Sequence, residues 1–294
     1  MAIVFALMTA IAYGLDNFLI RKGLIHTPYP IVAAFITLTI NFSFFVILSL
    51  IFIPFEFLKL NLIYLFIIAG ILAPGFARLL SYKGLEILGM SITTPIINAE
   101  SLFSVTMALF FLNEPINFSI VTGILGVMGG LVLLGYEIGQ KNERDISKRF
   151  RYRYLFYPIT ASLFYGVSVF FRKLGLNTLS SPILGATLTS GTSWCIITIV
   201  LATSGNMKRL VQVKKRSFIY FFLGGCATCI AWLSFFHALN IGRVVIVTPI
   251  ATSYSLFTLF LSYLLLRDME RMSLKIIVST ILIVGGIVLL SLVK

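Results

Sequence analysis

The chain has 294 residues, of which 59% are hydrophobic and only 11% are charged. A soluble domain has about a quarter of its residues charged, so this composition excludes a soluble protein and predicts one whose surface faces lipid. In that setting the net charge of +13 indicates basic loops beside a membrane, not a nucleic-acid-binding face.

Apolar segments separated by charged or proline-rich breaks predict ten transmembrane helices. Each is close to the roughly 20 residues that a spanning helix needs. The first carries Asp16 and is followed by Arg21 and Lys22 where a signal peptide would have a small-residue cleavage site, so we expect it to be a helix of the protein. The predicted class is all-α, polytopic, with helices at 2–20, 30–53, 62–86, 91–112, 117–136, 154–171, 182–204, 217–240, 244–266 and 273–293.

The second half of the sequence repeats the first. Residues 84–96 align without gaps on residues 238–250, and Glu114 aligns on Asp268 at the same offset. The predicted domains are therefore a five-helix repeat at 1–136, a charged linker at 137–153 and a second five-helix repeat at 154–294. Because five is odd, the second repeat enters the membrane from the opposite side, and inverted repeats of this kind are typical of secondary transporters.

Several repeated motifs resemble a known family. Tyr-Gly followed by Arg-Lys ends the first helix, Thr-Pro opens the fourth, and an acidic residue closes it at Leu112–Glu114, where the family usually has Gly-Glu-Arg. The chain thus resembles the EamA-type members of the drug/metabolite transporter superfamily. The resemblance implies a solute carrier with a central cavity between the two halves. It does not imply a substrate, since relatives carry amino acids, drugs, other metabolites, sugar phosphates and nucleotide sugars.

Two charges are predicted near the membrane centre. Arg78 and Glu100 each lie 11 residues from the expected turn near Gly89, about 16 Å along their helices, which is half of a roughly 30 Å hydrocarbon core. The second repeat has Trp232 and Tyr254 at these positions. Three hypotheses remain open: a structural ion pair, a site for the two ends of a zwitterion, or a proton site at Glu100 adjusted by Arg78.

Neighbouring residues complete the candidate site. Tyr82 shares the helix face of Arg78, Ser104 shares that of Glu100, and the aromatic residues suit an apolar or cationic part of a solute. Asp16 is predicted to be either a gate residue or the partner of Arg21 or Lys22 at a helix end. The candidate binding residues are Arg78, Glu100, Tyr82, Trp232, Tyr254, Ser104, Tyr13 and Tyr165, and the candidate gate residues are Asp16, Asn17 and His237.

The sequence predicts proton-coupled export of a small organic solute, such as an amino acid or a related metabolite or drug, by alternating access. The alternative is an uncoupled exchanger of an organic anion or a phosphorylated metabolite. No catalytic or metal-binding constellation is visible in the sequence, so we expect neither enzyme activity nor a cofactor. Cys226 and Cys229 have no second Cys or His pair and are interpreted as buried apolar residues.

The expected partners are the solute, protons and the lipid bilayer, with no nucleic acid, in a monomer or homodimer. Most of the 23 Lys and Arg residues follow odd-numbered helices. The positive-inside rule then places these loops in the cytoplasm and both termini outside, in a plasma (inner) membrane.

Overall fold

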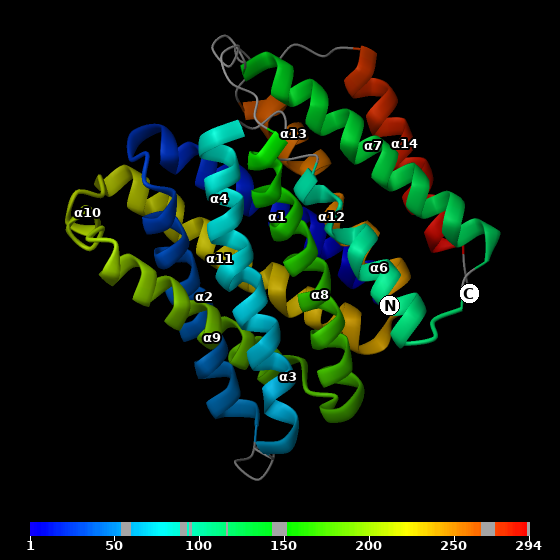
Figure 1. The fold of residues 1–294 in the computed structure, drawn as a ribbon, viewed down its shortest axis with the longest axis horizontal. Coiled ribbons are helices and arrows are strands. Elements are labelled where there is room, and N and C mark those ends of the chain that lie inside the picture. The colour runs from blue at the N-terminus through cyan, green and yellow to red at the C-terminus, as the bar shows by residue number, and fades with distance from the viewer. Residues whose placement is uncertain are drawn as a thin grey trace.

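The structure is a computed structural model that describes residues 1–53, 60–88, 93, 96–115, 117–142, 152–265 and 274–292. These residues form helices and connecting turns, with no strand among them (Figure 1). Six helical segments are long and apolar enough to cross a membrane, and four shorter apolar helices accompany them at 96–111, 118–133, 244–258 and 277–290. The predicted fold class, an all-α polytopic membrane protein, is confirmed.

Some spans are single helices and others are broken. The unbroken spans are α1 (Ala2–His26), α2 (Pro30–Phe52), α7 (Phe118–Asn142), α8 (Phe156–Leu179), α9 (Pro182–Thr203), α11 (Lys215–Ile241) and α14 (Leu274–Ser291). The broken spans contain α3 (Leu60–Gly70), η2 (Ile71–Phe76) and α4 (Ala77–Leu88); α6 (Glu100–Phe111); and α12 (Val244–Thr252) and α13 (Tyr254–Leu265). Two short helices, η3 (Tyr152–Leu155) and α10 (Lys208–Val211), lie in connections.

The fourth and ninth spans break at equivalent positions. Ala99 has φ −68° and ψ 0°, and Ser253 has φ −68° and ψ 1°. Each donates its N–H to the carbonyl three residues earlier, over 3.1 Å and 3.2 Å respectively. Glu100 and Tyr254 directly follow these breaks, so the two repeats share a backbone geometry at the point where their side chains differ.

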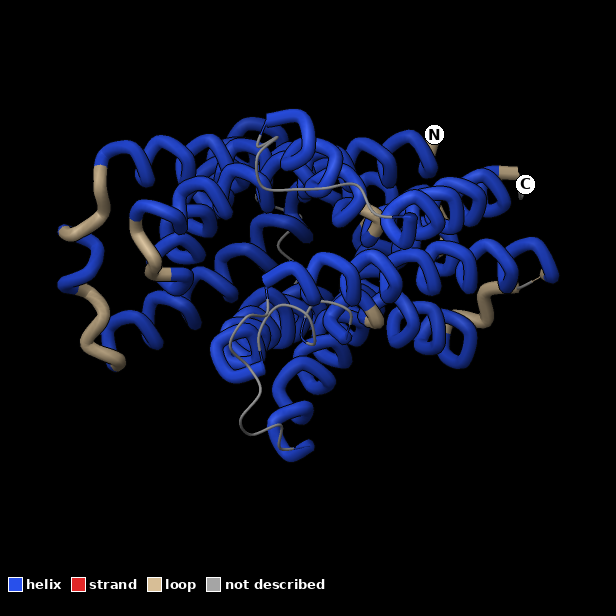
Figure 2. Tube along the Cα trace, turned by 90° about the horizontal axis from the view of Figure 1, so that it is seen from above, coloured by secondary structure: helices blue, strands red, loops and turns tan. Residues whose placement is uncertain are grey.

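The helix contacts also come in equivalent pairs. Helix α1 packs against α11 and α13, while its counterpart α8 packs against α3, α4 and α6. The contacts of α2 with α9 and of α7 with α14 each join a helix to its own counterpart. Figure 1 shows the α7–α14 pair at one side of the molecule, and Figure 2 shows the helices packed together in the view turned by 90°. Because these helix contacts in one half have equivalents in the other half, the protein consists of two five-helix repeats.

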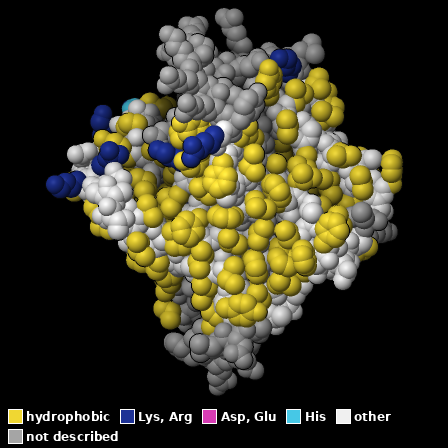
Figure 3. Space-filling model, viewed as in Figure 1, with side chains coloured by type: hydrophobic (Ala, Val, Ile, Leu, Met, Phe, Trp, Pro, Cys, Tyr) yellow, Lys and Arg dark blue, Asp and Glu magenta, His cyan; other side chains and the backbone are white. Residues whose placement is uncertain are grey.

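The surface is that of a membrane protein. Figure 3 shows a broad apolar face, with Lys and Arg gathered toward its upper end, near the α1–α2 connection and α10. Large exposed apolar side chains include Phe110, Phe118 and Leu125. Such a continuous apolar surface requires a lipid environment.

Two central helices are longer than predicted. Helix α1 runs to His26, not residue 20, and α8 runs to Leu179, not residue 171. Lys22 can stay in α1 because its ammonium lies 4.8 Å from the centre of the Phe18 ring and 6.0 Å from that of Tyr220. Consequently Asp16 lies in the middle of a helix, and Arg172, which the sequence suggested was in a loop, lies inside α8.

Three other sequence predictions involve residues outside the described ranges. The expected turn near Gly89, the acidic counterpart Asp268 and the linker residues 143–151 all lie there. Before the linker, α7 continues to Asn142, beyond the predicted end at residue 136.

Candidate functional site

A cavity of about 450 Å³ lies between the repeats, within the usual size range of small-molecule sites. Side chains from both repeats line it, including α1, α4 and α6 from the first and α8, α11 and α13 from the second. Of the residues predicted from the sequence, those that line the cavity are Tyr13, Asp16, Asn17, Arg78, Tyr82, Glu100, Tyr165, Trp232 and Tyr254.

Two predicted residues do not line the cavity. Ser104 is fully buried and its hydroxyl donates to the Ser101 carbonyl over 3.0 Å. The Nδ1 of His237 lies 2.8 Å from the Leu233 carbonyl oxygen, and its ring packs 5.6 Å from that of Phe5. Both residues serve helix packing in this arrangement, because neighbouring turns of their own spans take up their polar atoms.

The expected pairing of Arg78 with Glu100 does not occur. Both side chains are described, and no ion pair joins them within that part of the chain. Helices α4 and α6, which carry them, each pack against α8, and α8 contributes Tyr165 and Arg172 to the cavity wall. The basic side chain that acts on Glu100 is Arg172, and the acidic side chain that acts on Arg78 is Asp16. No ion pair joins Asp16 to Arg78 or Glu100 to Arg172 among the described residues either, so the site holds two acids and two guanidinium groups whose charges act on each other in this crossed arrangement.

Arg172 is held in place by the groups around it. Its Nη2 donates to the Ala73 carbonyl over 2.7 Å, and its Cζ lies 5.0 Å and 5.5 Å from the ring centres of Trp232 and Phe236. The side chain is only 6% exposed, and its Nε has no hydrogen-bond partner. A guanidinium stacked on aromatic rings and anchored at one nitrogen keeps its remaining donors in a fixed direction.

The carbonyl that anchors Arg172 lies at a break in the third span, where Ala73 is extended, with φ −149° and ψ 134°, so that its carbonyl points out of the helix. The next residue, Pro74, has no N–H to donate to the preceding turn of the helix. Polar side chains of α8 and α9 satisfy the carbonyls nearby: Ser168 donates to Ala69 over 2.8 Å, and Ser193 donates to Gly70 over 2.8 Å. Such compensation is required where water cannot reach the backbone.

Asp16 lies at the opposite wall of the site, on α1. It is 9% exposed, and its Oδ1 has no hydrogen-bond partner. Gly224 of α11 makes room for the carboxylate, since a Cβ at this glycine would lie 3.0 Å from Oδ1. Asp16 lies in the middle of α1 and not at a helix end, which contradicts the helix-end position that one of the two predictions for this residue required.

Tyrosines line the space between these charged groups. The rings of Tyr13 and Tyr254 lie 5.8 Å apart. Tyr82 and Tyr165 line the cavity together with Arg78 and lie near its guanidinium. Asn17 donates to the Tyr13 carbonyl over 2.8 Å and faces the cavity.

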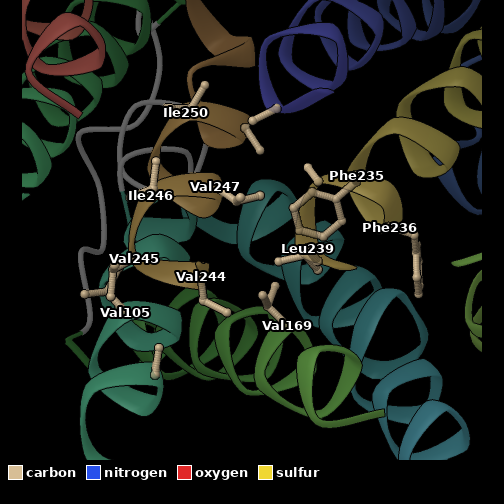
Figure 4. Packing of buried hydrophobic residues seen from close by; sticks show 14 of the residues in the cluster. Val105, Val169, Phe235, Phe236, Leu239, Val244, Val245, Ile246, Val247 and Ile250 are labelled. Atoms are coloured by element: carbon tan, nitrogen blue, oxygen red, sulfur yellow. The ribbon is translucent and has the colours of Figure 1, made fainter. Parts of the chain in front are cut away.

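The cavity reaches one end of the bundle. Its lining continues along α1 to Leu24, along α4 to Leu85 and onto Ala33 near the start of α2. The lining does not extend past a cluster of packed, buried apolar side chains toward the other end of the bundle, part of which is shown in Figure 4. We call this cluster the plug, and it includes Val169, Phe236, Leu239, Val244 and Val247.

A helical membrane protein made of two repeats around a charged central cavity has the form of a solute transporter. The model of the EamA-like transporter family matches residues 1–136 and 153–292. The chain belongs to the EamA-like transporter family.

Individual relatives agree with this placement. Over 95 residues the chain is 24% identical to an uncharacterized transporter encoded in the cobO 3′ region of a Sinorhizobium species, a match that covers 32% of this chain and 67% of that protein. A protein of known crystal structure superposes with a TM-score of 0.77 at 14% identity, covering 99% of this chain and 96% of the other. The second likeness shows a shared fold.

Proposed function

We propose that the protein is a secondary active transporter that exports a small zwitterionic solute, such as an amino acid, by alternating access coupled to protons. The observation that carries this proposal is that two acids, Asp16 and Glu100, and two guanidinium groups, Arg78 and Arg172, line the same cavity. Buried charges in a membrane are costly and usually serve transport or binding. A zwitterion needs both signs of charge.

The two guanidinium groups have different roles in this proposal. Arg78 binds the solute carboxylate, because its neighbours in the cavity include the Tyr82 and Tyr165 hydroxyls and no hydrogen bond to backbone fixes it among the described residues. Arg172 is already anchored to Ala73, so it stabilises the charged form of Glu100. The solute ammonium and a proton then compete for Glu100, which couples their movements.

The direction of transport follows from where the cavity opens. It opens where α1 ends and α2 begins, at the end of the molecule where Lys and Arg gather in Figure 3. The positive-inside rule places that end in the cytoplasm. This conformation would therefore load solute from the cytoplasm and export it.

Flux measurements in proteoliposomes test the proposal. Labelled amino acids of different side-chain classes would be offered with and without a pH gradient across the membrane. We expect at least one of them to accumulate only with the gradient and to move protons with it. Equal accumulation without a gradient would rule out proton coupling, and no flux of any zwitterion would rule out the substrate class.

Exchange of an organic anion is the second candidate. The sequence offered Arg78 as the main cationic group for an anion, and the structure adds Arg172 to the same cavity. Two guanidinium groups could bind a dicarboxylate or a phosphate ester. Counterflow of such an anion without a pH gradient, in liposomes that do not move amino acids, would favour this function.

A further inference from the structure

The turn between α11 and α12 lies at the closed end of the cavity, and Lys173 holds one side of it. The Lys173 Nζ donates to the Leu239 carbonyl over 2.7 Å and to the Gly242 carbonyl over 2.8 Å. These carbonyls belong to the C-terminal end of α11, where helical carbonyls lack partners and a positive charge is favourable. Lys173 therefore caps α11 from a different helix, α8.

Glu114 holds the other side of the turn. Its Oε1 accepts from the Val244 N–H over 2.9 Å and its Oε2 from the Val245 N–H over 3.0 Å. These are the first two residues of α12, whose free N–H groups favour a carboxylate. Asn113 directs Glu114 there: its left-handed φ of 50° ends α6.

The two side chains act on one turn from both repeats. Glu114 follows the fourth span and belongs to the first repeat, whereas Lys173 and the turn belong to the second. Glu114 also acts favourably on the charge of Lys173. The capped ends carry Leu239 and Val244, members of the apolar plug. Fixing this turn therefore fixes the plug that closes the cavity.

The first repeat has equivalent residues at the open end of the cavity, but the equivalent contacts of its lysine are not formed there. The counterpart of Lys173 is Lys22, and those of Leu239 and Gly242 are Leu85 and Leu88. Within the described part of the chain, Lys22 donates no hydrogen bond to α4; its ammonium lies over the Phe18 and Tyr220 rings. Asp268, the counterpart of Glu114, lies outside the described residues. Leu85 lines the open cavity. The turn at the closed end is therefore fixed by Lys173 and Glu114, whereas the equivalent region at the open end borders the way into the cavity.

We propose that Lys173 and Glu114 form a clasp on the α11–α12 turn that holds this end of the cavity closed, and that it opens in each transport cycle. In the opposite state Lys22 caps the end of α4 at Leu85 and Leu88, as Lys173 caps the end of α11 here. The proposal rests on the alternating access proposed above. Lys173 and Glu114 are positioning residues, because they act on the gate and not on the solute.

Thiol reactivity tests the clasp. In protein lacking Cys195, Cys226 and Cys229, a cysteine would replace Val247 in the plug or Ile20 in the open passage, and the purified protein in nanodiscs would be treated with a small polar methanethiosulfonate. We expect slow reaction at position 247 and fast reaction at position 20. Lys173→Met or Glu114→Gln should raise the rate at position 247 by about 10-fold, because each removes hydrogen bonds to a charged group.

Opposite changes at the two positions distinguish a gate from a general loosening of structure. The double variant Lys173→Met/Glu114→Gln should raise the rate at position 247 further and lower it at position 20, since the population moves to the opposite state. Lys22→Met should lower the rate at position 247, because it removes the alternative clasp. Lys215→Met, which removes an exposed lysine, is the neutral control.

Two outcomes would overturn the clasp: an unchanged rate at position 247 in both single variants, or rates that rise together at both positions. Either result could occur in protein that transports normally in proteoliposomes, and the clasp would then be wrong while the proposed function stands. Absence of transport by the unmodified protein would instead count against the proposed function.

Discussion

Arg172 is the cavity residue with the most fixed surroundings. The carbonyl of Ala73, at the break in the third span, anchors one end of its guanidinium, and two aromatic rings cover it. The acidic partner is Glu100. Removing the arginine charge leaves this carboxylate buried without a cation, which is the costly way to disrupt a charge pair.

Arg172→Gln should therefore lower stability by about 3 kcal/mol and weaken proton-driven transport, although the amide can still donate to Ala73. Arg209→Gln is the matched control, because Arg209 is exposed and its guanidinium lies over the Tyr29 ring; it should change stability by less than about 0.5 kcal/mol. Thermal unfolding in detergent and transport in proteoliposomes would measure both. Equal effects of the two substitutions would contradict the role of Arg172.

The crossed pairing predicts which double variants interact. Arg78→Met should destabilise the protein by leaving Asp16 without its cation, and adding Asp16→Asn should recover much of that loss, because replacing a whole buried pair is often close to neutral. The combination of Arg78→Met with Glu100→Gln should show a smaller coupling energy. Thermal unfolding of the two double-mutant cycles gives these coupling energies. A coupling energy larger for Arg78 with Glu100 than for Arg78 with Asp16 would instead support the pairing expected from the sequence.

The sequence predicted several cavity residues for a clear reason. Arg78 and Glu100 lie in long apolar runs, where a lone charge is conspicuous. Arg172 was missed because it stands next to Lys173, and two adjacent charges were interpreted as the end of a helix. The signal against that interpretation was the stretch after Lys173, which contains no helix-breaking proline before Pro182. The pairing could not be predicted, since it depends on α8 lying between α4 and α6.

At the scale of elements, one close contact occurs twice. A Cβ at Gly14 of α1 would lie 2.5 Å from the Phe257 Cβ of α13, and a Cβ at Gly166 of α8 would lie 2.5 Å from the Phe103 Cβ of α6. Gly14 and Gly166 occupy equivalent positions in the repeats, as do the two phenylalanines. These contacts set how closely the central helices approach the spans that carry Tyr254 and Glu100.

Gly14→Ala and Gly166→Ala should each destabilise the protein by about 1–3 kcal/mol, because the helices must separate to admit the methyl group. The repeat also offers matched controls. Gly129 and Gly285 lie in helices with nothing within 4 Å of an added Cβ, so alanine there should stabilise by roughly 0.5–1 kcal/mol. Melting temperatures in detergent would compare the four variants, and a loss at the control positions similar to that at Gly14 would contradict the packing argument.

Hydropathy predicted the number of spans, but it did not predict where the helices break and where they end. The Thr-Pro motif marked both the fourth and ninth spans, yet the bend in the ninth comes four residues after Pro249, at Ser253. Gly126 and Gly130 form a Gly-x-x-x-Gly motif in α7, a spacing that allows close helix packing in membranes. Both glycines face α14: a Cβ at Gly126 would lie 3.3 Å from the Cα of Gly286, and one at Gly130 would lie 2.6 Å from Ile283.

At the scale of the whole molecule, basic residues distinguish the two ends of the bundle. The α1–α2 end carries Lys208, Arg209 and the cluster Lys214–Arg216 near α10, and Figure 3 shows Lys and Arg toward this end. The turn between α8 and α9 lies at the other end (Figure 1). Orientation in the membrane sets the direction of transport, because the cavity opens at the basic end.

Cysteine labelling in intact cells tests the orientation. In protein without its native cysteines, Ser180→Cys in the α8–α9 turn should react with an impermeant thiol reagent, because Ser180 is exposed and this end should face outward. Ser147→Cys in the linker, outside the described residues, should react only after permeabilisation. The reverse labelling pattern would mean that the protein has the opposite orientation in the membrane, and that the observed conformation is open to the outside.

The central claim is that solute and protons compete for Glu100 in a cavity that opens alternately to the two sides. Its most direct test is transport by Glu100→Gln in proteoliposomes, with solute counterflow and pH-driven accumulation measured on the same preparation. Glutamine keeps the shape of the side chain but cannot carry the proton. We expect counterflow to persist while accumulation driven by the pH gradient is lost. Full pH-driven accumulation by this variant would show that Glu100 does not carry the proton.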